Sequence, residues 1–410
     1  MSLIKPFTGL RPAAGRAAEV LAPPYDVLNT EEAREKAQGK PWSFLHISKP
    51  EIDLDPGIDP YDESVYAKGA ENFQAMLDAG VLVRDEEPCY YVYRIIMGDH
   101  QQTGLVAGAS VAAYDRNDVR KHEFTRPKKE DDRVRQIDAL NAQTGPVFLT
   151  YKSTPVIDEV LRTTAENEPE VDVMLDDGVR HELWAIKDVN TIHALTDAFD
   201  KLGVIYVADG HHRSAAASRV AAMRRGDNPD PEASHEHFLT VIFPDKEMQI
   251  LDYNRVVRDL NGLEQNELLQ RIGESFSVVP ANGSVKPQKT GEFGMYLDGQ
   301  WYRLNIQPAL IPEDPVKKLD VSLLADHLIE PLLGISDPRT DDRIDFVGGI
   351  RGLGELEKRV NSGDMAVAFS LFPTSIHDLM AVADDNQVMP PKSTWFEPKL
   401  ADGMVSKVLD

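Results

Sequence analysis

The amino-acid sequence predicts an α/β fold of mixed α+β character that is divided into several domains. Apolar runs of strand length alternate with amphipathic helical segments along all 410 residues. Hydrophobic residues make up 42% of the chain and charged residues 27%, which is the usage of a globular protein. We expect an N-terminal α+β region over residues 1–150, a central α/β region over 151–275 and a C-terminal α+β region over 276–410.

The N-terminal region begins with a proline-rich extended segment. Thr30 is expected to cap a helix over 31–38, and periodic apolar residues predict a second helix over 63–79. Strands are expected at 89–97 and 103–114, joined by a Gly-Asp-His turn into a hairpin.

The central and C-terminal regions mix both element types. Helices are predicted at 156–166 and 190–201, on either side of a hairpin formed by 171–175 and 179–184. A buried strand at 204–208, an alanine-rich helix at 214–225 and a strand at 238–243 form an α/β unit. Further elements are a hairpin of 295–297 and 301–304, helices at 321–333 and 375–383, a strand at 366–372 and an extended arm at 389–396.

Charge and composition limit the function classes. The chain carries 68 acidic and 44 basic side chains, a net charge of −24, which repels polyanions and argues against nucleic acid as a partner. Cys89 stands alone, so neither an intrachain disulfide nor a thiolate zinc cluster can form. No apolar run reaches the roughly 20 residues of a membrane span, and no signal peptide is recognisable. We expect a cytoplasmic protein without a membrane partner.

The most informative motif is Ala-Asp-Gly-His-His-Arg at 208–213, between the predicted strand and the alanine-rich helix. His211, His212 and Arg213 bring positive charge to a helix N-terminus, where an anion would reverse the unfavourable electrostatics. Gly210 allows close approach of the backbone, and the Arg213 guanidinium matches a phosphate. The alternatives are a plain cap and turn at Asp209 and Gly210, or metal binding by the histidines.

Two further motifs carry candidate residues. The run Arg116–Arg135 holds eight basic and five acidic residues, so it is locally positive in an acidic chain. Lys129 and Arg133 lie four apart and would share a helical face near a phosphate, although a solvated, salt-bridged helix would look the same. In the second motif, Pro23 and Pro24 hold Asp26 rigidly, either as a general base or magnesium ligand or simply as a turn cap.

These motifs carry a resemblance to known families, whereas P-loop, Rossmann, zincin and nucleophile-elbow patterns are absent. Residues 24–27, Glu123 with 129–133, 208–213 and 389–396 together resemble a large bacterial and archaeal family of domains of unknown function. Residues 204–225, with Gly210 and Arg213 in the defining places, also resemble the ParB/sulfiredoxin superfamily, which includes free serine kinases. That resemblance implies a strand-turn-helix core that binds nucleotide phosphates.

The leading functional hypothesis is a small-molecule kinase or phosphotransferase that uses ATP or ADP, with Mg²⁺ as a further candidate cofactor. Gly210, His211, His212 and Arg213 would bind phosphates. Lys129 and Arg133 would neutralise the charge of the transferring group. Asp26 or Glu123 would take the hydroxyl proton, and Asp209 would orient a histidine or hold magnesium. The superfamily resemblance names free serine as acceptor. The rivals are a non-catalytic nucleotide-binding regulator and a phosphodiesterase or nuclease, which the acidic charge disfavours.

Overall fold

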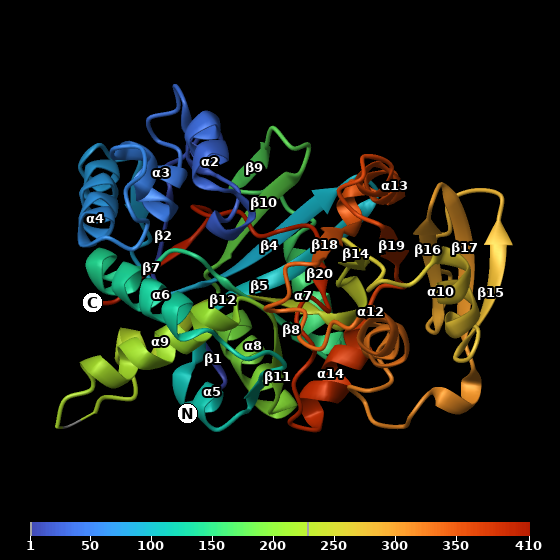
Figure 1. The fold of residues 1–410 in the computed structure, drawn as a ribbon. Coiled ribbons are helices and arrows are strands. Elements are labelled where there is room, and N and C mark those ends of the chain that lie inside the picture. The colour runs from blue at the N-terminus through green and yellow to red at the C-terminus, as the bar shows by residue number, and fades with distance from the viewer. Residues whose placement is uncertain (1, 228) are drawn as a thin grey trace. The chain divides into compact units, whose positions relative to one another are not determined.

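The computed structural model describes residues 2–227 and 229–410 and places them in two units (Figure 1). Unit 1 comprises residues 1–248 and 398–410, and unit 2 comprises residues 249–397. Each unit has its own sheets and helices, which confirms the predicted multi-domain, mixed α/β class. The boundaries between the two units lie before Gln249 and after Glu397. These divisions differ from the three regions expected from the sequence, which stay a prediction.

Unit 1 is built on a large mixed sheet with the strand order β6-β11-β8-β12-β5-β4-β10-β9, and β1 pairs with β5. Its strands are β1 (Ile4–Lys5), β4 (Tyr90–Met97), β5 (His100–Ser110), β6 (Val119–Arg120), β8 (Val147–Tyr151), β9 (Val171–Met174), β10 (Arg180–Ile186), β11 (Ile205–Asp209) and β12 (His237–Pro244). A second sheet has the order β3-β2-β21-β7, formed by β2 (Gly9–Pro12), β3 (Leu82–Arg84), β7 (Ala142–Gln143) and β21 (Ser406–Val408).

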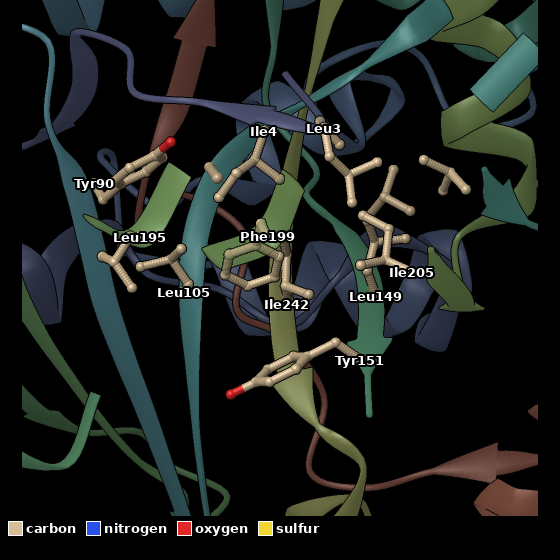
Figure 2. Packing of buried hydrophobic residues seen from close by; sticks show 14 of the residues in the cluster. Leu3, Ile4, Tyr90, Leu105, Leu149, Tyr151, Leu195, Phe199, Ile205 and Ile242 are labelled. Carbon is tan, nitrogen blue, oxygen red and sulfur yellow. The ribbon is translucent and has the colours of Figure 1, made fainter. Parts of the chain in front are cut away.

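The helices of unit 1 bury apolar faces against these sheets and against each other. They are α1 (Ala17–Val20), α2 (Thr30–Ala37), α3 (Leu45–Ser48), α4 (Glu63–Asp78), α5 (Val111–Asp115), α6 (Pro127–Leu140), α7 (Pro155–Thr164), α8 (Val189–Leu202) and α9 (His211–Arg224). In the main core, Leu195 and Phe199 of α8 pack with strand residues such as Leu105, Leu149 and Ile242, all of them fully buried (Figure 2). Full burial of one such side chain stabilises the fold by roughly 1.5–3 kcal/mol.

Unit 2 contains a six-stranded antiparallel sheet with the order β15-β17-β16-β19-β14-β18. Its strands are β14 (Tyr253–Val257), β15 (Phe276–Ala281), β16 (Glu292–Leu297), β17 (Gln300–Ile306), β18 (Ile344–Gly348) and β19 (Val367–Ser370), beside a short pair of β13 (Ile250–Leu251) and β20 (Trp395–Phe396). Its helices are α10 (Gln265–Ile272), α11 (Asp320–Leu324), α12 (Glu330–Leu333), α13 (Leu353–Asn361) and α14 (Ile376–Asp384); a π-helical turn at Ala325–Ile329 joins α11 to α12.

Several predicted element ends differ from the structure, and three of these differences are in how helices begin. Asn29, not Thr30, caps α2, because its side chain accepts from the Glu32 amide while the Glu32 carboxylate accepts from the Asn29 amide. Residues 111–114, predicted as strand, begin α5, since the Ser110 side chain accepts from the Ala113 amide and caps a helix there. The alanine-rich helix begins at His211 instead of residue 214.

Within the part of the chain that the structure describes, every helix is too short or too polar to cross a membrane.

Candidate functional site

The candidate site forms where β11 ends and α9 begins. A register shift in the pairing of β11 with β8 occurs between Val207 and Asp209, so the last residue of the strand leaves the regular ladder. Gly210 follows with φ +93°, a left-handed conformation that glycine adopts without steric cost. The chain then enters α9 without a side-chain cap. All three charged or titratable residues of the 211–213 segment therefore lie in the first helical turn.

Two packing arrangements bring other segments to this turn. β6 pairs in parallel with β11, so the loop that follows Arg120 leaves the sheet edge beside the start of α9. The helix after that loop, α6, lies side by side with α9 (Figure 1). Val134 and Ile137 of α6 pack on Ala216 and Val220 of α9, and the small alanine side chain permits a close approach. The basic run predicted from the sequence is thus brought to the 208–213 motif.

Asp209 is held as a carboxylate by two partners. Its Oδ1 accepts from the Gly210 amide at 2.8 Å, and its Oδ2 accepts from the Lys399 ammonium at 2.9 Å. Burial alone would raise the pKa of Asp209, but the Lys399 ammonium together with the Arg213 guanidinium outweighs burial and lowers it below the ordinary value. Lys399 belongs to the C-terminal segment, 190 residues away in sequence. Asp209 therefore acts first as the link between the turn and that segment.

The two histidines are neutral and face different partners. The His211 ring is buried, its Nε2 accepts from the His122 amide at 3.4 Å, and its Nδ1 lies 3.6 Å from Glu123 Oε2. His212 Nε2 accepts from the Arg126 amide at 3.0 Å. Because amide donors occupy Nε2 in both rings, the ring proton belongs on Nδ1. Burial lowers the pKa of both imidazoles, which favours this uncharged state.

Arg213 turns away from the histidines toward the proline-rich motif. Its Nη1 donates to the Pro146 carbonyl at 2.9 Å, and its Nη2 donates to Asp26 Oδ2 at 3.3 Å. The Cζ atoms of Arg213 and Arg133 lie 5.2 and 4.0 Å from the centre of the Tyr25 ring, within the range of cation–π attraction. The structure therefore joins Asp26, Arg133 and Arg213, three predicted site residues from three separate motifs.

A small cavity of about 30 Å³ opens beside this cluster, and Tyr25, Arg133, Arg213, Ser48 and Asp402 are among its lining residues. Three buried polar atoms at the cavity, Arg213 Nε, Ser48 Oγ and Asp402 Oδ1, have no hydrogen-bond partner among the described residues. Buried polar groups without partners are costly and rare. The volume suits two or so water-sized groups and is too small for a nucleoside.

Asp402 anchors the proline-rich motif from the C-terminal segment. Its backbone pairs with Ala22, and its Oδ2 accepts from the Tyr25 amide at 3.3 Å. Burial raises the pKa of Asp402 to about 7, and the Arg213 guanidinium opposes that rise. The protonated form of this carboxyl group is therefore favoured far more than in an exposed aspartic acid.

The other predicted residues lie at the rim. Lys129 is exposed on the first turn of α6, and its ammonium adds to the burial that lowers the pKa of His212. The Glu123 side chain is 52% exposed and approaches His211, not the Asp26 cluster. The two candidate bases thus sit on different sides of the α9 start. Among the described residues, no three His, Cys, Asp or Glu side chains gather as a metal site, so we derive no step through magnesium.

Sequence reasoning missed Lys399, Asp402, Ser48 and His122. The first two follow the predicted proline-rich arm, but that arm, residues 389–396, belongs to unit 2. Lys392 in that arm has its Nζ 5.5 Å from the centre of the Tyr253 ring, within unit 2. The adjacency of His122 to Glu123 in the basic run was the one available signal for that residue.

Several solved structures are similar to this chain at low identity. Similar solved structures include a free serine kinase in complex with AMP, at TM-score 0.34 and 13% identity over 68% of this chain and 84% of that chain. SbnI with a C-terminal truncation from Staphylococcus aureus has TM-score 0.39 and 11% identity over 71% and 82% of the two chains. A conserved hypothetical protein from Pyrococcus furiosus has TM-score 0.33 and 13% identity over 70% and 90%. These scores carry no functional argument.

Sequence comparison is more decisive about family. No curated protein matches the chain. A family model, in contrast, matches residues 4–322, which include the proline-rich motif, the basic run and the 208–213 motif. The chain therefore belongs to the family described as "Protein of unknown function (DUF1015)".

Proposed function

We propose that this protein is a nucleotide-dependent kinase that transfers a phosphoryl group from ATP or ADP to the hydroxyl group of a small molecule. The observation that carries the proposal is the 3.3 Å contact between Asp26 Oδ2 and Arg213 Nη2 beside the first turn of α9. It puts a candidate general base next to a candidate phosphate-binding group. Phosphoryl transfer needs both functions within a few ångströms.

The phosphate side of the proposed site is the uncapped start of α9. The first turn of α9 lies at the positive end of the helix, and Gly210, whose own amide donates to Asp209, lets the backbone turn into it. Arg213 and Lys129 add positive charge there, in a chain whose net charge is −24. The neutral His211 and His212 rings contribute shape and neutral N–H donors rather than charge.

The acceptor side is the Asp26 cluster and its cavity. The unpartnered Arg213 Nε, Ser48 Oγ and Asp402 Oδ1 would bind the small polar end of the acceptor. Asp26 would then take the hydroxyl proton as the acceptor oxygen forms its bond to the terminal phosphorus. The bond from that phosphorus to the bridging oxygen breaks, and ADP or AMP leaves with the electron pair. Arg133 and Arg213 would stabilise the charge on the transferring group. Free serine is the acceptor named by the sequence resemblance.

One observation favours a second candidate, a nucleotide-binding regulator without transfer chemistry. Asp26 is paired with Arg213, and Glu123 lies near the buried His211 instead of the cavity. A regulator needs the phosphate-binding residues and no free base. The two candidates differ in turnover, not in nucleotide binding.

The test combines binding and turnover. The protein is incubated with ATP or ADP and a panel of hydroxylated amino acids that includes serine, and phosphorylated products are detected by mass spectrometry. Arg213→Ala should abolish nucleotide binding measured by calorimetry, whereas the exposed-arginine control Arg162→Ala should not. Asp26→Asn should stop transfer and keep nucleotide binding. Nucleotide binding without any product would support the regulator, and unchanged nucleotide binding in Arg213→Ala would refute the site itself.

A further inference from the structure

Unit 2 contains a larger cavity that the proposed kinase site does not use. Its volume is about 200 Å³, and its polar lining comes from Lys318, Asp320, Asp378 and two threonines, with Leu319 and Phe372 among its apolar residues. An apolar cavity of about 150 Å³ is known to hold a benzene molecule. The unit 2 cavity therefore has room for a ligand of slightly more than six non-hydrogen atoms.

Asp320 is the unusual residue in this lining. It lies at the start of α11, and only 7% of its surface is exposed. Its Oδ1 accepts from the Gly291 amide at 2.8 Å, but its buried Oδ2 has no hydrogen-bond partner among the described residues. A buried carboxyl oxygen without a partner is costly. A cavity of this size beside it offers the space for the missing donor.

The charges around the cavity indicate what kind of donor fits. Two carboxyl groups, Asp320 and Asp378, and one ammonium group, Lys318, line it. Asp378 accepts from Ser375 through Oδ2 as part of the cap of α14 and is not buried, whereas the open oxygen of Asp320 is buried. A ligand ammonium would pair with Asp320, and a ligand carboxylate would pair with Lys318. Leu319 and Phe372 provide apolar surface for the remainder.

We propose that this cavity binds a small amino acid with an apolar side chain, with its ammonium on Asp320, its carboxylate toward Lys318 and its side chain against Leu319 and Phe372. The site lies within unit 2 and is independent of the kinase proposal. Its probe is valine, whose eight non-hydrogen atoms suit the space.

The proposal carries a pH dependence. Burial raises the pKa of Asp320 to about 7; the Gly291 amide opposes this rise, and the nearby Asp378 carboxylate adds to it. Lys318 is the one cation lining the cavity among the described residues. An ammonium ligand binds the ionised form of Asp320. Valine affinity should therefore increase as the pH rises from 5.5 to 8, with release of a proton on binding below about pH 7.

Isothermal titration of the full-length protein with three matched probes tests the proposal. Valine should bind more tightly than isobutylamine, which lacks the carboxylate, and than 3-methylbutanoate, which lacks the ammonium. Asp320→Asn should weaken valine binding about tenfold or more. The matched control Asp326→Asn, in the following helical turn and outside the cavity lining, should leave valine binding unchanged.

A second variant covers the case in which Asp320→Asn fails to fold. Lys318 is half-buried, and Lys318→Gln should weaken the binding of valine while leaving the binding of isobutylamine unchanged. If valine gives no heat of binding, the proposal is overturned and the cavity holds only water. Equal binding of valine and isobutylamine, or of valine and 3-methylbutanoate, would overturn the assignment to an amino acid.

Discussion

Replacement of Asp402 by asparagine should make the protein more stable, and more so at high pH. In the structure this carboxyl group is 2% exposed, and its pKa is raised by burial to about 7. The folded protein thus holds the proton more tightly than the unfolded chain does. Ionisation of Asp402 above pH 4 therefore favours unfolding, whereas asparagine cannot ionise. The asparagine carbonyl can still accept from the Tyr25 amide, as Asp402 Oδ2 does.

The magnitude follows from the two pKa values. The pKa is 3.8 for an ordinary aspartic acid and about 7 for Asp402. This difference corresponds to about 4 kcal/mol in the free energy of unfolding once the pH exceeds both pKa values. At pH 5 only the unfolded chain is ionised, and the gain in the free energy of unfolding is smaller, roughly 1–2 kcal/mol. For a unit of this size, the melting temperature should rise by roughly 8 °C at pH 8 and by about 3 °C at pH 5.

Thermal unfolding between pH 4 and pH 8.5 measures this difference. Asp197→Asn, at an exposed position on α8, is the matched control and should change the melting temperature little at any pH. A gain in Asp402→Asn that does not grow with pH, or a loss at pH 8, would refute the reasoning. If the cavity binds the acceptor, the stabilised variant should also lose phosphoryl transfer, which is the usual trade of stability against function.

Three further changes test other parts of the site. Gly210→Ala should lower the free energy of unfolding by about 1–3 kcal/mol because φ is +93° at this position. The added Cβ would not clash, since its nearest atom is 3.5 Å away, so the loss measures backbone strain. Gly226→Ala, where an added Cβ meets open space, is the control in thermal unfolding. Tyr25→Leu should weaken ADP binding several-fold in calorimetry by removing the ring beside Arg133 and Arg213, whereas Tyr25→Phe should not. Lys399→Met should lower the melting temperature at pH 7, because the Lys399 ammonium lowers the pKa of Asp209 and so stabilises the fold fully above about pH 4. The loss should shrink steadily as the pH falls below about 4 toward the lowered pKa of Asp209, and a loss that is the same at every pH would contradict this.

Local patterns predicted most elements, and their failures have local causes. The segment Val111-Ala-Ala-Tyr suits a strand or a helix equally, and the Ser110 side chain that caps α5 decides between them. At the start of α2, two adjacent residues, Asn29 and Thr30, are both good caps. The reciprocal bonds between Asn29 and Glu32 select the first. Such choices depend on hydrogen bonds that residue type alone does not reveal.

The site was predicted in pieces and not as an arrangement. Each motif could be recognised because Gly210, Arg213 and Asp26 stand in unusual local sequences. The contact of Asp26 with Arg213, however, joins residues 187 apart, and no local periodicity predicts it. Lys399 and Asp402 were missed because the chain re-enters unit 1 after 149 residues of unit 2, a return that carries no local signal.

The ion pairs of the site suggest an order of events in the proposed reaction. Arg213 is paired with Asp26, and Lys399 is paired with Asp209, so each cation has a carboxylate partner before any phosphate arrives. A phosphate that binds Arg213 must compete with Asp26 and thereby frees that carboxylate. Nucleotide binding would then free the Asp26 carboxylate that the acceptor hydroxyl needs. Without a nucleotide, Asp26 stays paired with Arg213 and does not act as a base. The Asp26→Asn variant, which removes the competitor, should for the same reason bind nucleotide more tightly while transferring no phosphate. Weaker nucleotide binding in that variant would mean that Asp26 itself helps to hold the nucleotide.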